Sequence, residues 1–218
     1  MQIQPLGDRA VLVMLPDEAA AFSFTQSLQA ENWPWLQDVV PAYSTVGVFF
    51  AEEARSAQVQ AELTKLQFTG ENQVAGKTHR IPVCYERNLD LVHVAEATGL
   101  RAEEVIRLHT SCEFTAYAIG FVPGFPYLGY LPAELAGVPR LASPRVRVEP
   151  GSVGITGKQT GIYPLARPGG WNIIGQTPLT IVDVEAEFFP MRVGDRVRFE
   201  RIDEAEFQRL HGERLETV

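Results

Sequence analysis

IGFVPGFPYLGYLPAELAGVPRLASPRVRVEPGSVGITGKQTGIYPLARPGGWNIIGQTP, residues 119–178, holds eleven of the eighteen glycines and nine of the fifteen prolines of the chain. Glycine allows positive φ and the close approach of another backbone or of a ligand. Proline fixes φ at about −65° and removes a hydrogen-bond donor. Apolar and aromatic residues recur between them and need a core or a pocket. The stretch therefore predicts rigid turns rather than a flexible linker.

This turn-rich stretch is basic within an acidic chain. It contains four arginines and one lysine against two glutamates, whereas the whole chain has a net charge of −8. A basic, glycine-rich surface can attract a small anion; in the alternative interpretation, these arginines only decorate a solvated face. The acidic balance of the whole chain argues against general nucleic-acid binding, which requires basic surface.

Composition sets further bounds. A chain of 218 residues suits one or two domains. Two cysteines make neither a disulfide framework nor a zinc pattern, so we expect no metal site and a reducing, cytoplasmic location. The first residues lack the pattern of a signal peptide, and no apolar run is long enough to span a bilayer.

The first part of the chain alternates strand and helix signals. Apolar β-branched runs and helical periodicity predict a small αβ domain over 1–78, whose polar, glycine-bearing end at 69–78 is the expected boundary. The segment 39–50 is predicted to form either one bent strand or two. The expected elements are a strand at 9–15, a helix at 19–30, strand structure at 39–50 and a helix at 52–68.

The second part, 79–218, begins with a strand and two helices and continues as many short strands with dense turns. Such a pattern predicts a barrel or a sandwich, and thus an α+β chain overall. The tail at 213–218 is expected to fray. The expected elements are helices at 89–98, 101–110 and 202–212 and strands at 79–85, 113–120, 145–148, 153–155, 171–174, 179–184 and 195–200.

Glycines around Lys158 suggest anion binding without forming a phosphate loop. Gln159 stands where such a loop needs Ser or Thr, and the following glycine and proline oppose the required helix. The amides near Gly151, Gly154 and Gly157 are expected either to form an anion nest or only to turn a barrel corner.

His109 is the best general acid or base candidate in the sequence. It ends a predicted helix just before a strand that leads into the turn-rich stretch, and helix C-termini favour a protonated imidazole. The competing interpretation is a structural histidine on an apolar helix face. Cys112 lies three residues on, but proximity in sequence does not make a catalytic pair. Cys84 is predicted to be a buried strand residue.

Several polar and aromatic side chains of the stretch are candidates for a binding pocket. Gln159 offers both a donor and an acceptor and Tyr163 a hydroxyl, so both can orient a small amide or carboxylate. Four aromatic residues are expected either to wall a pocket or to belong to the core. These are Phe121, Phe125, Tyr127 and Trp171.

Three long motifs give the chain a family likeness. GFVPGFPYLGYLP (120–132), PRLASPRVRVEPGSVGITGKQTGIYP (139–164) and PGGWNIIGQTP (168–178) resemble the signature of the family of bacterial 5-oxoprolinase B subunits. That family includes sporulation-kinase inhibitor homologues and allophanate hydrolase subunit 1. The helix at 103–117 and the N-terminal strands are also similar, so the likeness covers nearly the whole chain. One departure is visible, because 86–88 lack the glycine-rich insertion that family members often carry.

The resemblance implies a small N-terminal αβ domain followed by a cyclophilin-like β-barrel. It implies an ATP-dependent opening of 5-oxoproline to glutamate together with a larger C-type barrel subunit and a third component. ATP, with Mg²⁺, would be bound by this chain or only in the presence of its partner, and the chain alone would be inactive. Alternatives are an allophanate hydrolase or urea carboxyltransferase-type subunit, and a binding module that inhibits a histidine kinase.

For the implied reaction, cations and N–H donors must meet developing phosphoryl charge. Lys158, Arg145 and the amides around Gly154–Gly157 are the candidates for that role, while His109 and Gln159 would orient the substrate or move a proton. These groups are expected to share one hollow with the aromatic residues.

Overall fold

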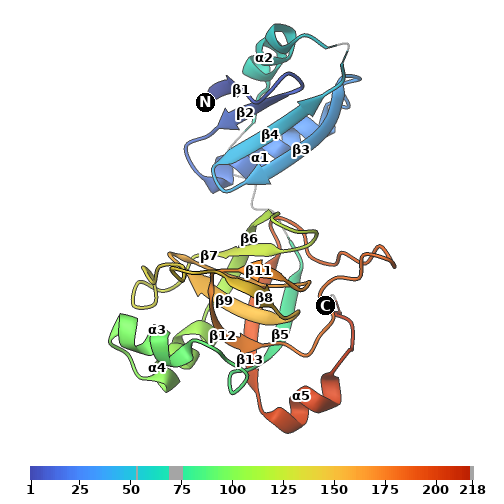
Figure 1. Cartoon of the computed structure of the whole chain (residues 1–218). Coiled ribbons are helices and arrows are strands. Elements are labelled where there is room, and N and C mark those ends of the chain that lie inside the picture. Colours follow the sequence, from blue (N-terminus) through green and yellow to red (C-terminus); the bar gives the residue numbers. More distant parts are fainter. Residues whose placement is uncertain (53, 69–75, 217–218) are drawn as a thin grey trace. The chain divides into compact units, whose positions relative to one another are not determined.

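The computed structural model describes residues 1–52, 54–68 and 76–216. The chain divides into two units, Met1–Ala75 and Gly76–Val218, which Figure 1 shows with their elements labelled. Most of the predicted boundary at 69–78 lies outside the described residues.

The N-terminal unit is a four-stranded antiparallel sheet whose strands follow the order β1-β2-β4-β3. The segment predicted as one bent strand or two forms two strands, joined by a tight turn. Beside the predicted elements, the sheet has an edge strand, β1, that no sequence signal indicated. The elements are β1 (Gln2–Pro5), β2 (Ala10–Met14), α1 (Glu18–Ala30), β3 (Leu36–Ala42), β4 (Thr45–Phe50) and α2 (Ser56–Lys65).

Alternation along β4 explains why the helices cover one face of this sheet. Val46, Val48 and Phe50 are buried on that face, as period-two spacing requires. Both helices contribute to the same apolar cluster, for example through Leu28 of α1 and Leu63 of α2.

The second unit contains a closed barrel with strands in the order β10-β7-β6-β13-β5-β12-β9. This confirms the α+β class and, of the two expected architectures, the barrel. All neighbouring strands are antiparallel except β5 and β13, which run parallel. The barrel strands are β5 (Thr78–Cys84), β6 (Glu113–Ile119), β7 (Pro126–Gly129), β9 (Ser152–Thr156), β10 (Gln159–Ile162), β12 (Asn172–Gln176) and β13 (Arg196–Ile202).

Three helices and a two-stranded sheet complete this unit. The helices α3 and α4 lie next to each other beside the barrel, and α5 follows its last strand (Figure 1). The short sheet pairs β8 with β11. Their bounds are α3 (Leu91–Thr98), α4 (Ala102–Thr110), β8 (Arg145–Val148), β11 (Arg167–Gly169) and α5 (Glu204–Leu210).

Two predictions for this unit were wrong. The segment 179–184 forms no strand, only isolated bridges at Thr180 and Asp183. Its successive residues Ile181 and Val182 are both buried, whereas neighbouring residues of a strand face opposite sides. The described part of the tail does not fray, because Leu215 is buried and its N–H donates to the carbonyl of Thr180. The strands β7, β10 and β11 were not predicted.

Candidate functional site

The turn-rich stretch forms an aromatic pocket of about 250 Å³ in the barrel unit. The four aromatic residues that the sequence suggested as pocket walls all line it. Phe125 lies at their centre, with its ring centroid 5.2 Å from that of Tyr163 and 5.4 Å from that of Trp171, both edge-on. We call this the barrel pocket. Its lining residues are Phe121, Phe125, Tyr127, Arg140, Pro144, Tyr163, Pro168, Gly169, Gly170 and Trp171.

Glycines let the strands approach these rings closely. A Cβ atom placed on Gly161 of β10 would lie 2.8 Å from the carbonyl oxygen of Pro126 and 3.0 Å from both Phe125 and Trp171. A Cβ on Gly169 would overlap with the hydroxyl of Tyr163. The walls of the pocket are therefore fixed by backbone contact and have little room to adjust.

The electrostatics of the barrel pocket favour an anion. Arg140 is the charged residue in its lining, and its side chain is exposed. Burial raises the pKa of Tyr127 and of Tyr163, while the nearby Arg140 guanidinium lowers it by a smaller amount. Both phenols thus stay protonated at neutral pH and can donate hydrogen bonds. Arg140 was counted only as one of five bases in the sequence, and nothing in its neighbours singled it out.

Arg145 lies outside this lining and ties three elements together. Its Nη2 donates to Asp90 Oδ1 at 2.6 Å, and Asp90 Oδ2 accepts from the backbone N–H of Ile173 at 2.7 Å. β8 is thereby held to the start of α3 and to β12, next to the Trp171 wall. The Nη1 atom of Arg145 is buried without a hydrogen-bond partner in the described structure.

His109 is fully buried in the barrel unit, where the second interpretation of this residue, a structural role, fits better. Its Nδ1 lies 2.7 Å from the Tyr85 hydroxyl and its Nε2 lies 2.9 Å from Thr160 Oγ1, which also donates to the carbonyl of Gly154. This chain of bonds places the proton on Nε2. The ring also stacks on Phe199 with centroids 4.5 Å apart.

The protonation of His109 follows from this burial. Desolvation lowers the pKa of His109 to about 3. The imidazole is therefore neutral at physiological pH, and desolvation outweighs the helix-end effect expected from the sequence. Cys112 is not paired with it, because both ring nitrogens have other partners and Cys112 Sγ contacts the carbonyl of Leu108. Cys84 is buried, as predicted.

Lys158 and Gln159 lie at the turn between β9 and β10 and do not line the barrel pocket. Lys158 is exposed and Gln159 half-buried. Because His109 is enclosed in the core, the hollow expected to unite these three residues does not form. Of the predicted binding residues, Phe125, Tyr163 and Trp171 come together, and Arg145 stands behind them.

The predicted anion nest does not form either. The N–H of Gly151 donates to the carbonyl of Tyr163, and that of Gly157 to the carbonyl of Val138. Gly154 lies inside β9, where it pairs with Gly161 and Ile173. These glycines shape the barrel, which was the other interpretation.

The described residues do not fit Mg²⁺-ATP. The amides around Gly151 and Gly157 are used within the protein, and Lys158 has no neighbouring cradle of free N–H groups. The described part of the chain also contains no group of three His, Cys, Asp or Glu side chains that could hold a metal ion. The barrel pocket, with its single guanidinium, suits a small monoanion better than a triphosphate.

Comparison with known proteins defines the class. Residues 1–190 match the family described as carboxyltransferase domain, subdomain C and D, and the chain belongs to this family. In the part of the chain that the structure describes, no helix is long and apolar enough to cross a membrane.

Curated relatives within this class are all named as the B subunit of 5-oxoprolinase. The Bacillus subtilis (strain 168) protein is 35% identical over 234 residues, covering 94% of this chain and 95% of the relative. The Haemophilus influenzae protein is 38% identical over 215 residues, covering 91% and 97%. The Escherichia coli O157:H7 protein is 51% identical over 122 residues, covering 55% and 56%. The family likeness inferred from the three motifs is thus confirmed.

Solved structures agree with this assignment. TTHA0988 is 33% identical with a TM-score of 0.77, over 89% of this chain and 40% of that longer chain. PH0987 from Pyrococcus horikoshii, a conserved uncharacterized protein, is 38% identical with a TM-score of 0.55, over 94% and 100%. Kluyveromyces lactis urea carboxylase is 16% identical with a TM-score of 0.75, over 99% and 23%, which shows a shared fold alone.

Proposed function

We propose that this chain is the B subunit of a cytoplasmic, ATP-dependent 5-oxoprolinase, and that the barrel pocket holds 5-oxoproline while the lactam is opened to glutamate. The names of its full-length relatives support the reaction. The single observation that supports the site is an aromatic pocket of about 250 Å³ whose charged lining residue is Arg140. This volume lies just under the roughly 300–1,000 Å³ of drug-sized ligand sites, as a small substrate requires.

The chemistry of 5-oxoproline matches the lining. In our proposal the Arg140 guanidinium pairs with the substrate carboxylate, because a charge-assisted fork of N–H donors suits that group. The protonated hydroxyls of Tyr127 and Tyr163 are available to donate to the lactam carbonyl oxygen. The flat lactam ring packs against Phe125 and Trp171, which also exclude water from it.

ATP belongs elsewhere in this proposal. Because the described residues do not fit Mg²⁺-ATP, we assign the nucleotide to the larger C-type barrel subunit or to the third component. The chain would then hold the substrate but remain inactive alone. Its own contribution is to orient the lactam and to keep its carboxylate neutralised.

The test compares two arginine variants in the complex reconstituted with its two partners, ATP and 5-oxoproline. Arg140→Gln should lower glutamate formation at subsaturating substrate by about tenfold to a hundredfold, the effect of one charged hydrogen-bonding partner. Arg147→Gln is the matched control, because Arg147 is exposed, pairs with Glu149 and lies outside the pocket lining. It should leave the rate unchanged.

Binding to the isolated chain separates the site from the reaction. 5-Oxoproline should shift the indole N–H signal of Trp171 in NMR spectra, and Arg140→Gln should weaken that titration. Equal turnover in both arginine variants would remove the pocket from the mechanism. Turnover of urea or allophanate in place of 5-oxoproline would instead favour the carboxyltransferase-type alternative.

A further inference from the structure

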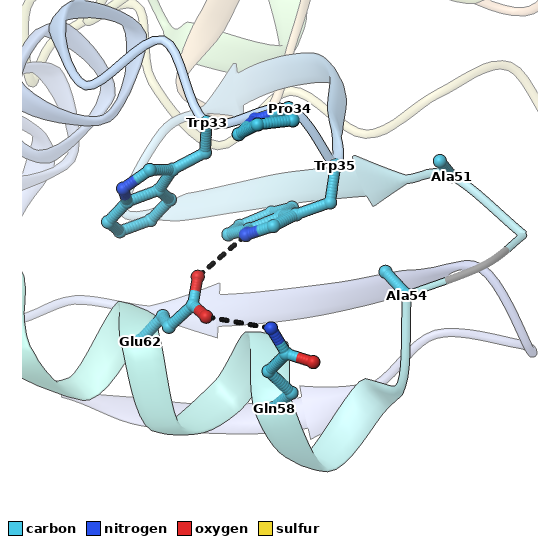
Figure 2. Close-up of a pocket in the computed structure, with 7 residues that line it drawn as sticks. All are labelled: Trp33, Pro34, Trp35, Ala51, Ala54, Gln58 and Glu62. Atoms are coloured by element: carbon cyan, nitrogen blue, oxygen red, sulfur yellow. Dashed lines mark hydrogen bonds between the residues drawn. The ribbon is translucent and has the colours of Figure 1, made fainter.

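A second pocket, of about 620 Å³, lies in the N-terminal unit and has no part in the proposed reaction. Its walls are two tryptophans from the segment between α1 and β3, small residues that follow β4, and two side chains of α2. Figure 2 shows both indole rings above the side chain of Glu62. We call it the tryptophan pocket. It is lined by Trp33, Pro34, Trp35, Ala51, Ala54, Gln58 and Glu62.

The two indoles are held in a fixed arrangement. The ring centroids of Trp33 and Trp35 lie 5.0 Å apart, with an angle of 31° between the planes. Trp35 Nε1 donates to Glu62 Oε2 at 2.6 Å, which anchors the ring to α2. Both tryptophans pack against the core of the unit from its periphery and are only half-buried. Aromatic surface is therefore left open at a defined place.

The charge of the tryptophan pocket is negative. Glu62 is the charged residue of its lining, and its other oxygen accepts from Gln58 Nε2 at 3.0 Å. Hydrogen bonds from Gln58 and Trp35 lower the pKa of Glu62, so the carboxylate is ionised at neutral pH. Among the described residues, no lysine or arginine forms an ion pair with it. A carboxylate has about four lone-pair sites, so acceptor capacity remains.

We propose that the tryptophan pocket binds a guanidinium cation through the indole faces and the carboxylate of Glu62. Indole faces attract cations, and tryptophan is the strongest of the aromatic side chains in this respect. A guanidinium is planar and weakly hydrated, so it can lie on an indole while its N–H groups reach a carboxylate. Two sources share this chemistry, an arginine side chain of another polypeptide and a free arginine-like small molecule.

The test follows indole N–H signals of the full chain by NMR. The chain has three tryptophans, and Trp33→Phe and Trp35→Phe variants assign the two pocket signals. N-acetyl-arginine amide, titrated at constant ionic strength, should shift the Trp33 and Trp35 signals to saturation and leave Trp171 in place. The citrulline analogue, which is uncharged but of similar shape, should have no effect.

Two charge variants make the test specific. Glu62→Gln keeps an oxygen for Trp35 but removes the charge, and should weaken binding by about tenfold or more. Glu134→Gln removes the same charge from an exposed turn of the barrel unit and should leave binding unchanged. Thermal unfolding of each variant shows whether it is folded, and Trp33→Leu, which removes an indole face without touching the carboxylate, should also weaken binding.

The result distinguishes the sources and can overturn the proposal. Saturation by the capped arginine assigns the pocket to an arginine within a polypeptide, whereas saturation by free arginine alone assigns it to a small molecule. The proposal fails if citrulline acts as arginine does, or if Glu62→Gln binds as tightly as the unaltered chain.

Discussion

The barrel pocket and the tryptophan pocket use the same materials with opposite charge. Each sets one charged side chain against aromatic rings, Arg140 in the barrel unit and Glu62 in the N-terminal unit. Aromatic walls accept either sign, because ring faces attract cations and ring edges attract anions. The single charge therefore decides which class of ligand each pocket favours.

The two pockets also differ in how they are built. The walls of the barrel pocket come from the turn-rich stretch, where glycines bring backbone and rings into contact. The tryptophan pocket is formed by a loop and the exposed side of α2, and one hydrogen bond links the two. We expect changes in the barrel to cost more stability, and each prediction below separates the pockets through their own tryptophan signals.

The largest effect is expected for Asp90→Ala. The substitution leaves the half-enclosed Arg145 guanidinium without its partner and frees the N–H of Ile173, at a cost of about 2 to 3 kcal/mol of unfolding free energy. Chemical denaturation measures this loss. The Trp171 signal should move, while Trp33 and Trp35 stay.

Glu149→Ala is the control for Asp90→Ala. It also breaks an arginine–carboxylate pair, but the Arg147–Glu149 pair is exposed and should contribute nothing measurable. Equal destabilisation by both substitutions would show that Asp90 and Arg145 do not brace the barrel pocket.

A smaller effect is expected for Gly161→Ala. The added methyl group meets the Pro126 carbonyl at 2.8 Å and the rings of Phe125 and Trp171 at 3.0 Å. Overpacking of this kind costs about 1 to 3 kcal/mol. Titration of the purified chain should also show weaker 5-oxoproline binding, because two pocket walls must move.

Gly120→Ala is the matched control for this glycine. A Cβ on Gly120 meets nothing closer than 4.0 Å, at Tyr127. If Gly161→Ala binds 5-oxoproline as well as Gly120→Ala does, the walls are more pliable than the contacts imply.

Mild acid should weaken the barrel unit through His109. Its pKa is about 3 in the folded chain and about 6.5 when unfolded, so the unfolded state binds the extra proton and stability falls as the pH falls. Between pH 7.5 and 5.5 this group alone removes about 1.4 kcal/mol. All four histidines lie in the barrel unit, so this histidine effect is absent from the N-terminal unit.

The measurement compares the pH slope of unfolding for the unaltered chain and for His109→Gln. The variant should lose this part of the slope, whatever its stability at pH 7.5. Imidazole ¹⁵N shifts provide an independent check, since His109 should keep its proton on Nε2 and stay neutral at pH 5.5. A charged His109 at that pH would contradict its assignment as a core residue.

Sequence reasoning predicted the elements whose signals are local. The alternation of Val46, Val48 and Phe50 and the spacing of Val59, Leu63 and Leu66 identify a strand and a helix without reference to other residues. The family motifs then supplied the barrel. Short strands such as β7 and β10 carry glycine and proline, which look like turns until their partners are known.

The site was only partly predictable for the same reason. Aromatic residues between turn residues need shelter, so Phe125, Tyr127 and Trp171 could be grouped from the sequence. The burial of His109 depends on the closure of the barrel around it, and the loss of the nest depends on carbonyls at Val138 and Tyr163. Which of five bases reaches the pocket is likewise set by tertiary structure, and Arg140 was missed.

The parallel pairing of β5 with β13 has a consequence for synthesis. These partners are separated by more than a hundred residues, and β13 is the last strand of the chain. On the ribosome the N-terminal sheet has all its strands early, while β5 must wait with an open edge until translation is nearly finished. A message truncated before residue 196 would therefore yield an unclosed, aggregation-prone sheet, so the cell's quality control has a simple signature of incomplete product.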